Sequence, residues 1–384
     1  MKTLICDLNV YENGHHIAFV NSILSHAARR EDLLFLFNGM AASLCKSMEN
    51  NERIFFVPED ILHPDELGSL RDKMREYRFI RKFALEHRVE RVIFLEIDWY
   101  QVAIGLSSRP PFKITGIYFR PFHLIPTRGA GLKSSLRSLV YHLKKRLLFH
   151  ILRINRKVEP LFLLNDRMAG VRYPSWFRYL PDPVFDAGGG AATQRSASIR
   201  GQFDIPQGAH IILAFGAMGA RKNIGNIVSA YQQATFDGKT VLLIAGKVRA
   251  DYRAAFNRAI DSFSGNMDPN KRLIVFDSFV DEEHIDLYFS EAGTILLCYS
   301  KFYGSSGLMG KAAQHRKTCI VPDRGLLYEL NREYRLGYAV DPENVRNIAE
   351  ALTMAQREPV PDEGFQRFVR DHHESAFLRT LLTV

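Results

Sequence analysis

One short segment of the sequence carries the residue types of a phosphate-binding turn. In YGSSGLMGKAAQHRK, residues 303–317, a serine and glycine turn (Ser305, Ser306, Gly307) follows Tyr303, and Lys311 comes eight residues after the tyrosine. The segment lies between two apolar runs, GTILLCYS and TCIVP, so it is expected to open a helix between two buried strands. Backbone amides and hydroxyls at a helix start can hold phosphate oxygens. A single helix-capping serine would explain the turn without a ligand, although it would not need the glycine beside it.

The spacing in this segment excludes a nucleotide-hydrolysing P-loop. Gly304 precedes Gly310 by six residues instead of five, and Ala312 stands where that motif has a magnesium-binding hydroxyl. No two aspartates in the chain are two positions apart, so an Asp-x-Asp pair that could bind a metal ion is also absent from the sequence. We therefore expect no metal cofactor, and we expect cations of the chain to neutralise a bound phosphate.

A second turn, FGAMGARKNIGNI, offers such cations. A strand is expected to end at Gly216, and a helix is expected to begin near Lys222, with Arg221 directly before it. Glycine lets a ligand approach the backbone, and the free amides of the helix start favour an anion. Cations at a helix start interact unfavourably with the helix dipole. The alternative, that Arg221 and Lys222 are simply solvated side chains without a ligand, is therefore weakened. A third turn follows LLIAG at Gly246, and none of the turns matches the dinucleotide fingerprint.

The segments around these turns alternate between strand-like and helix-like patterns along the whole chain, which predicts an α/β fold of two Rossmann-like domains facing a cleft. Pro and Gly interrupt the alternation in RYLPDPVFDAGGGAATQ, which we interpret as a linker. We expect an N-terminal domain over 1–180, a C-terminal domain over 181–363, and an amphipathic helix over 364–384. The expected strands are TLICDLN, LLFLFN, RIFFVP, RVIFLEI, KITGIYF and LFLLN in the first half, and HIILAFG, TVLLIAG, RLIVFD, GTILLCYS, TCIVP and GYAV in the second.

Composition restricts the compartment and the class of protein. A chain of 384 residues with 46% hydrophobic residues can form two domain cores. Its four cysteines have no paired close spacing, which indicates neither a zinc site nor a disulfide framework. No apolar run reaches the roughly 18 residues of a membrane span, and the N-terminal run is too short for a signal peptide. We expect a cytoplasmic protein, either soluble or attached to the inner membrane face at its surface.

The net charge of +9 is concentrated in one region. Between Trp99 and Val158 there is no Asp or Glu but there are twelve Lys and Arg residues. Within 128–157, leucines and an isoleucine recur at helical spacing (Leu132, Leu136, Leu139, Leu143, Leu147, Ile151), which predicts an amphipathic basic helix. Such a helix can lie on an anionic membrane or pack on a core with a solvated basic face, and we weigh the two evenly. Nucleic acid is disfavoured because no reader motif or stacking pattern accompanies the cations.

Taken in order, the motifs of the second half resemble the donor-binding domain of retaining GT-B glycosyltransferases of the glycogen-synthase-like and mannosyltransferase-like group. The resemblance covers residues 180–355 through YLPDPVF, FGAMGARKNI, LLIAG, VFDSFVDEEHIDLYFSEAGTILLCYS, YGSSGLMGKAAQHRKTCIVP and LGYAVDPENVRNIAEAL. The first half matches only in pattern, through NGHHIAFVNSIL. The resemblance also implies that the helix over 364–384 crosses back to the N-terminal domain. The group usually has two glutamates where this chain has Tyr303 and Lys311, and an arginine where it has Ala217.

The resemblance implies the roles of individual residues. Lys222 matches the phosphate lysine, Arg221 would supply the missing charge, and Lys311 would contact a phosphate or the ribose. His123 and Arg120, on the loop YFRPFHLIP, are the expected catalytic residues, although a structural histidine is equally expected at 123. His15 and His16 are expected on the acceptor side, where a structural role is again as plausible. The expected donor-binding residues are Gly14, Gly216, Arg221, Lys222, Gly246, Phe279, Val280, Tyr303, Ser305, Ser306, Gly307, Leu308 and Lys311.

The implied function is transfer of a sugar from a nucleotide-sugar donor to a glycan or lipid-linked acceptor, with retention of configuration and without a metal, in bacterial surface polysaccharide biosynthesis. The departing phosphate would help to deprotonate the acceptor. Two alternatives stay open: a non-catalytic subunit that binds sugar nucleotides and supports a partner transferase, suggested by the missing acidic pair, and a sugar-nucleotide epimerase of the same architecture. An epimerase would need carboxylates near the sugar, and the expected turns are poor in them.

Overall fold

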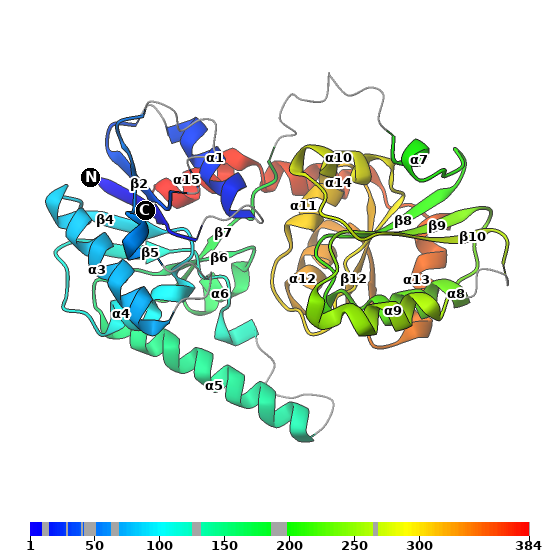
Figure 1. The fold of residues 1–384 in the computed structure, drawn as a ribbon, viewed down its shortest axis with the longest axis horizontal. Coiled ribbons are helices and arrows are strands. Elements are labelled where there is room, and N and C mark those ends of the chain that lie inside the picture. Colours follow the sequence, from blue (N-terminus) through cyan, green and yellow to red (C-terminus); the bar gives the residue numbers. More distant parts are fainter. Residues whose placement is uncertain are drawn as a thin grey trace. The chain divides into compact units, whose positions relative to one another are not determined.

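The computed structural model describes residues 1–9, 15–27, 30–39, 41, 51–62, 69–124, 132–185, 198–263 and 268–383. The chain divides into two compact units, each built on its own parallel sheet (Figure 1). Unit 1 comprises Met1–Pro181 together with Glu374–Val384, and unit 2 comprises Asp182–His373.

Unit 1 contains a five-stranded parallel sheet in the order β3-β2-β1-β4-β5. Four of these five strands are largely or wholly buried, as expected for a parallel sheet covered on both faces. The order reverses between β1 and β4, so the ends of these two strands form the switch point of the sheet. The strands are β1 (Thr3–Asp7), β2 (Leu33–Phe37), β3 (Ile54–Phe56), β4 (Arg91–Phe94) and β5 (Lys113–Gly116).

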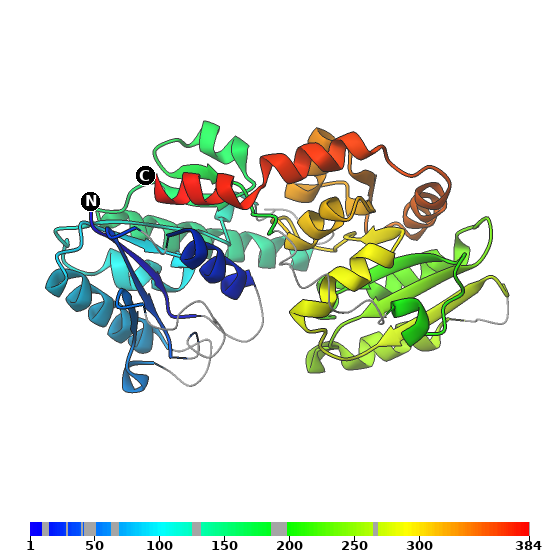
Figure 2. The ribbon, with the colours of Figure 1, turned by 90° about the horizontal axis from the view of Figure 1, so that it is seen from above.

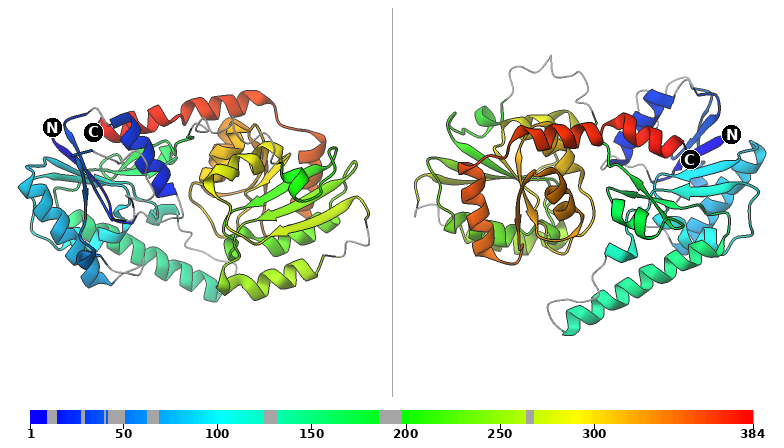
Figure 3. Two further views of the ribbon diagram at one scale, coloured as in Figure 1. Left: turned by 45° about the horizontal axis from the view of Figure 1, so that its top comes forward. Right: turned by 180° about the vertical axis from the view of Figure 1, so that it is seen from behind.

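Helices cover both faces of this sheet. α3 (Leu70–Glu86), α4 (Gln101–Gly105) and α5 (Leu132–Ile154) contribute to one core, which contains Ile80, Ile104 and Phe149. α1 (His15–Ala27) packs with α15 (Glu374–Leu382), where the rings of Phe19 and Phe377 are 5.1 Å apart (Figures 2 and 3). A capping box at Ser69 and Asp72 starts α3.

Part of the predicted linker is a strand. β7 (Phe177–Leu180) pairs in parallel with β6 (Leu161–Leu164), and the short helix α6 (Arg167–Arg172) connects them. The prolines and glycines that dominate this stretch obscured FRYL, whose strand conformation depends on the distant partner β6. The remainder of the predicted linker, residues 186–194, lies outside the described residues.

Unit 2 contains a six-stranded parallel sheet in the order β10-β9-β8-β11-β12-β13. Its order reverses between β8 and β11, and ligands of open α/β sheets bind at the carboxyl ends of strands beside such a reversal. The strands are β8 (His210–Phe215), β9 (Thr240–Ala245), β10 (Lys271–Phe276), β11 (Thr294–Leu296), β12 (Thr318–Pro322) and β13 (Gly337–Val340).

Two separate apolar cores lie on the two faces of this sheet. One involves α8 (Ile224–Gln233), α9 (Arg253–Asp261) and α13 (Val345–Arg357). The other involves α10 (Glu282–Glu291), α11 (Gly307–Gln314), α12 (Gly325–Tyr334) and α14 (Asp362–Asp371), and the short helix α7 (Ile199–Gln202) adds to it. These helices hold the strand ends and their turns in fixed positions.

The C-terminal segment 364–384 is not the single helix expected from its sequence. α14 ends at Asp371 within unit 2, and α15 begins at Glu374 within unit 1. The helix is interrupted because the backbone pairs with another segment: Val184 donates its amide to the carbonyl of His372 (2.8 Å) and bridges to His373. Such long-range pairing leaves no signal in the local pattern.

Candidate functional site

The turn after β8 contains a buried ammonium group. Lys222 is 4% exposed, donates to the Phe215 carbonyl, and lies 3.2 Å from the hydroxyl of Tyr299. None of the carboxylates in the described part of the chain is within ion-pair distance of its Nζ. A buried cation without a counter-ion is costly, so this arrangement favours a bound anion.

Gly216 lies beside that ammonium. Its φ of +94° is a conformation that side chains disfavour, and a Cβ at this position would lie 3.6 Å from Lys222 Nζ and 4.0 Å from Leu308. A side chain at position 216 would therefore contact the ammonium, which is bordered here only by backbone. The distance to Leu308 also shows that the turn after β8 and the start of α11 lie side by side.

Arg221 is exposed and lies over two aromatic rings. Its guanidinium carbon is 5.2 Å from the ring centroid of Phe302 and 5.8 Å from that of Tyr299. The Arg221 carbonyl accepts from the amide of Ser300 (2.9 Å), which ties this turn to the segment after β11. Arg221 and Lys222 thus flank Tyr299 at the switch point of the sheet.

Gly246 brings the end of β9 against the same turn. Its φ is +139°, and an added Cβ would lie only 2.2 Å from the Gly216 carbonyl oxygen, so no other residue fits without a shift. Farther along, Val280 is buried, whereas Phe279 is 57% exposed after β10. An exposed aromatic ring at a strand end can stack on a base.

The segment around Tyr303 is held by backbone contacts. The Leu326 amide donates to the Tyr303 carbonyl (3.0 Å), and Gly325 packs so closely that an added Cβ would lie 2.8 Å from the Tyr303 Cα. Ser305 donates to Asp182 (2.7 Å), and burial raises the pKa of that carboxyl to about 6, with the serine hydrogen bond opposing the shift.

The serine at the start of α11 does not cap the helix with its hydroxyl. Ser306 occupies the N-cap but makes no side-chain cap bond, and its hydroxyl lies 3.5 Å from that of Tyr299. Ser306 therefore does not have the plain capping role that the sequence allowed. A Cβ at Gly307, the first helical residue, would meet open space.

Lys311 has a carboxylate partner. Its ammonium donates to Asp286 Oδ1 (2.9 Å), and His315, one turn farther along α11, lies 2.8 Å from the same oxygen. Hydrogen bonds from His315 first and Lys311 second lower the pKa of Asp286 to about 2. The expected contact of Lys311 with a phosphate or ribose stays a prediction, and it would require this pair to open.

His123, in unit 1, is bound to a carboxylate. Its Nε2 lies 2.7 Å from Asp166 Oδ2, while Asp166 Oδ1 accepts from the Ala169 amide and so caps α6. The ring also packs near Phe177, with centroids 5.3 Å apart. These contacts give His123 a structural role, whereas its catalytic role stays a prediction.

Arg120, the other expected catalytic residue, lies beside a buried carboxyl group. Its exposed guanidinium lies 5.0 Å from the ring centroid of Trp99, and its amide donates to Asp98 (3.1 Å). Asp98 also accepts from the Phe119 amide (2.8 Å), and burial raises its pKa to about 6. Gly14 lies outside the described residues, as do the side chains of His15 and His16.

Sequence reasoning missed several polar residues at both switch points. In unit 1, Lys73 pairs with Glu76 (2.9 Å), which accepts from the Tyr100 hydroxyl (2.7 Å). In unit 2 the missed residues are Tyr299, Asp182 and Asp286. Tyr299 alone had a signal in the sequence, because it is the next-to-last residue of the apolar run GTILLCYS, beside the expected strand end.

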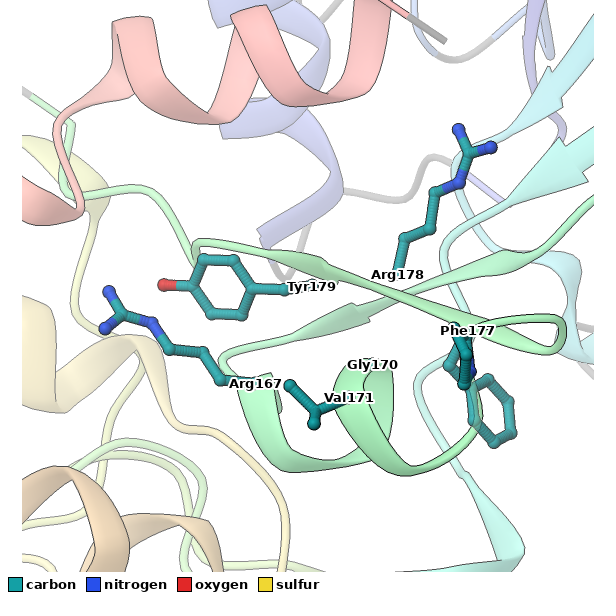
Figure 4. A pocket seen from close by; sticks show the side chains of 7 residues that line it. Arg167, Gly170, Val171, Phe177, Arg178 and Tyr179 are labelled. Carbon is teal, nitrogen blue, oxygen red and sulfur yellow. The ribbon is translucent and has the colours of Figure 1, made fainter.

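Neither a metal-ligand cluster nor a pocket coincides with the residues singled out from the sequence, within the part of the chain that the structure describes. Within the described ranges, no three His, Cys, Asp or Glu side chains are grouped to hold a metal ion. An open hollow in unit 1 is lined by α6 and β7, with the Arg167 guanidinium 4.9 Å from the Tyr179 ring centroid (Figure 4). The hollow contains none of the residues singled out from the sequence.

Comparison with solved structures identifies the architecture. Sucrose-phosphate synthase from Thermosynechococcus elongatus superposes with a TM-score of 0.68 at 12% identity, over 99% of this chain and 96% of that one. An α,α-trehalose-phosphate synthase (UDP-forming) from Burkholderia xenovorans, in complex with glucose-6-phosphate, gives 0.69 at 10% identity over 100% and 99%. The chain has the GT-B fold.

A third structure with this fold is HepE from Anabaena in complex with UDP and glucose, with a TM-score of 0.64 at 13% identity over 100% of this chain and 98% of that one. No protein-family model and no curated protein sequence matches the chain. The expected α/β class and the resemblance to GT-B enzymes are confirmed at the level of the fold.

Proposed function

We propose that this GT-B protein is a glycosyltransferase that moves a sugar from a nucleotide-sugar donor to an acceptor hydroxyl. The observation that carries the proposal is the buried Lys222 ammonium, which has no carboxylate partner among the described residues and lies beneath Gly216 at the switch point of unit 2. A diphosphate fits this position because it supplies the missing negative charge.

The residues of the turn suggest how the leaving group would be stabilised. Negative charge grows on the nucleoside diphosphate as the glycosidic bond breaks, and pre-positioned cations lower the energy of that state. Lys222 would hold the diphosphate from below, and Arg221, already oriented by Phe302, would approach it from the solvent side. We propose that no metal is needed, that configuration is retained, and that the phosphate helps to deprotonate the acceptor.

The nucleoside would lie along the strand ends next to the phosphates. Phe279 offers an exposed ring for the base, and Gly246 leaves the backbone uncovered. HepE was solved with UDP and glucose, so uridine diphosphate is the first ligand to test. For the acceptor we propose a glycan or a lipid-linked glycan of bacterial surface polysaccharide synthesis, used in the cytoplasm.

One observation favours the alternative of a non-catalytic subunit that binds sugar nucleotides. Tyr303 and Lys311 replace the acidic pair of similar enzymes, and Lys311 already has Asp286 as a partner. Such a subunit would bind UDP without transferring or releasing sugar. Release of UDP from UDP-sugars in the presence of candidate acceptors separates the two functions.

The binding site is tested by calorimetry with UDP and GDP. We expect Lys222→Met to weaken nucleoside-diphosphate binding by about 1 to 3 kcal/mol, the range for a charge-assisted hydrogen bond. Lys271→Met is the matched control, because Lys271 is also shielded and lies 5.6 Å from an aromatic centroid, but has Asp268 as a partner (3.5 Å). Equal affinity of Lys222→Met and the wild type would disprove the phosphate site.

A further inference from the structure

Helix α5 presents a row of apolar side chains to solvent. Leu136, Val140, Leu143 and Leu147 are each 51–62% exposed, and their spacing of four, three and four residues puts them on one side of the helix. Phe149 and Leu152 are fully buried and lie on the opposite side, where they pack on unit 1. The apolar row is therefore not the face by which α5 joins the core.

This arrangement favours the membrane-surface interpretation of the helix over the core-packed one, both of which the sequence left open. A core-packed helix would bury the leucine row, whereas here the row is exposed and a second set of residues forms the core contact. The N-terminal half of α5 extends beyond the rest of unit 1 (Figures 1 and 3). An exposed apolar row of this length on one helix marks an interaction surface.

Exposed cations border the row on both sides. Arg137 and Lys144 lie along one edge, and Arg146 lies along the other, as follows from about 3.6 residues per turn. Lys145 is buried on the opposite side, where burial lowers the pKa of its ammonium, so it does not belong to this surface. The helix contains no acidic residue.

We propose that α5 lies along the surface of a bilayer that contains anionic lipids, with the leucine row among the acyl chains and the bordering cations at the headgroups. This pattern is the one that interfacial helices use. A second copy of the chain fits less well, because apposed α5 helices would bring cations together without any acidic partner on the helix. The proposal rests on α5 alone and is independent of the transferase activity.

The proposal is tested by sedimentation of the whole protein with vesicles of phosphatidylcholine, alone or mixed with phosphatidylglycerol. We expect binding only to the mixed vesicles and release by salt, since screening acts over about 8 Å at physiological ionic strength. Two variants separate the apolar and ionic contributions: Leu143→Ser with Leu147→Ser, and Arg137→Gln with Lys144→Gln and Arg146→Gln. Each should weaken binding at least about tenfold.

Matched controls come from exposed positions elsewhere in unit 1. Leu106→Ser removes an equally exposed leucine (64%), and Arg71→Gln with Arg78→Gln and Lys82→Gln removes three exposed cations from α3. Both controls should bind like the wild type. The proposal is overturned if the wild type ignores mixed vesicles, binds neutral ones equally, or keeps its binding in the Leu143 and Leu147 variant. It is also overturned if the wild type forms a dimer that this variant abolishes.

Discussion

The ammonium of Lys222 lies 4.6 Å from the ring centroid of Tyr299 and 3.2 Å from its hydroxyl. The two residues come from the turns after β8 and β11, the neighbouring strands at which the order of the sheet reverses. Tyr299 thus shields a charge that the described residues leave without a counter-ion. This combination is expected of a site that accepts an anion.

Lys222→Met should not destabilise the protein by more than about 1 kcal/mol, because it removes a buried charge together with its desolvation penalty. Lys271→Met should lower the melting temperature, since it breaks an ion pair and a hydrogen bond to the Gln232 carbonyl (2.8 Å). Thermal unfolding without ligand makes the comparison. A Lys222 variant that melts lower than the Lys271 variant would indicate that Lys222 is mainly structural.

Gly246→Ala should destabilise unit 2 by more than about 2 kcal/mol and weaken UDP binding, because the backbone is strained for a side chain and the new Cβ would displace Gly216. Gly225→Ala is the control. Its Cβ would meet open space within α8, so it should stabilise the protein by about 0.5 to 1 kcal/mol. Urea unfolding of both variants checks this, and similar midpoints would refute the close packing of the two turns.

The sequence predicted those parts of the site that are local in the chain. Gly216 ends the apolar run HIILAFG, and Lys222 and Ser306 each lie six residues after the end of such a run, so the expected strand ends located them. Asp182 and Asp286 were not found, since their partners Ser305 and Lys311 are 123 and 25 residues away. Such pairs come together only when unit 2 folds.

The strand order and the exposure of α5 could not be predicted from the sequence for a related reason. A leucine row at helical spacing is the same whether the helix buries it or presents it to solvent. The difference lies in Phe149 and Leu152, which form the core contact instead. In the same way, β7 is a strand only because β6 lies beside it.

The Asp182 carboxyl should make stability depend on pH. Burial raises its folded-state pKa to about 6, above its unfolded value near 3.9, so its protonated form favours the fold. This contribution is complete below about pH 4 and is lost as the pH rises through about 6. The melting temperature of Asp182→Asn relative to the wild type should therefore rise between pH 4 and 7.5. Ser305→Ala should move the transition to higher pH, and a pH-independent difference would contradict this assignment.

Lys311→Met and Asp286→Asn distinguish a ligand contact of Lys311 from a purely structural pair. Asp286, with its pKa near 2, is ionised above about pH 3 and holds the Lys311 ammonium through Oδ1. If Lys311 contacts the donor, Lys311→Met should weaken UDP binding by about 1 kcal/mol, whereas Asp286→Asn, which releases the ammonium, should leave affinity equal or higher. Calorimetry at pH 7 measures both. If the two variants weaken binding equally, Lys311 acts only by holding α10 against α11.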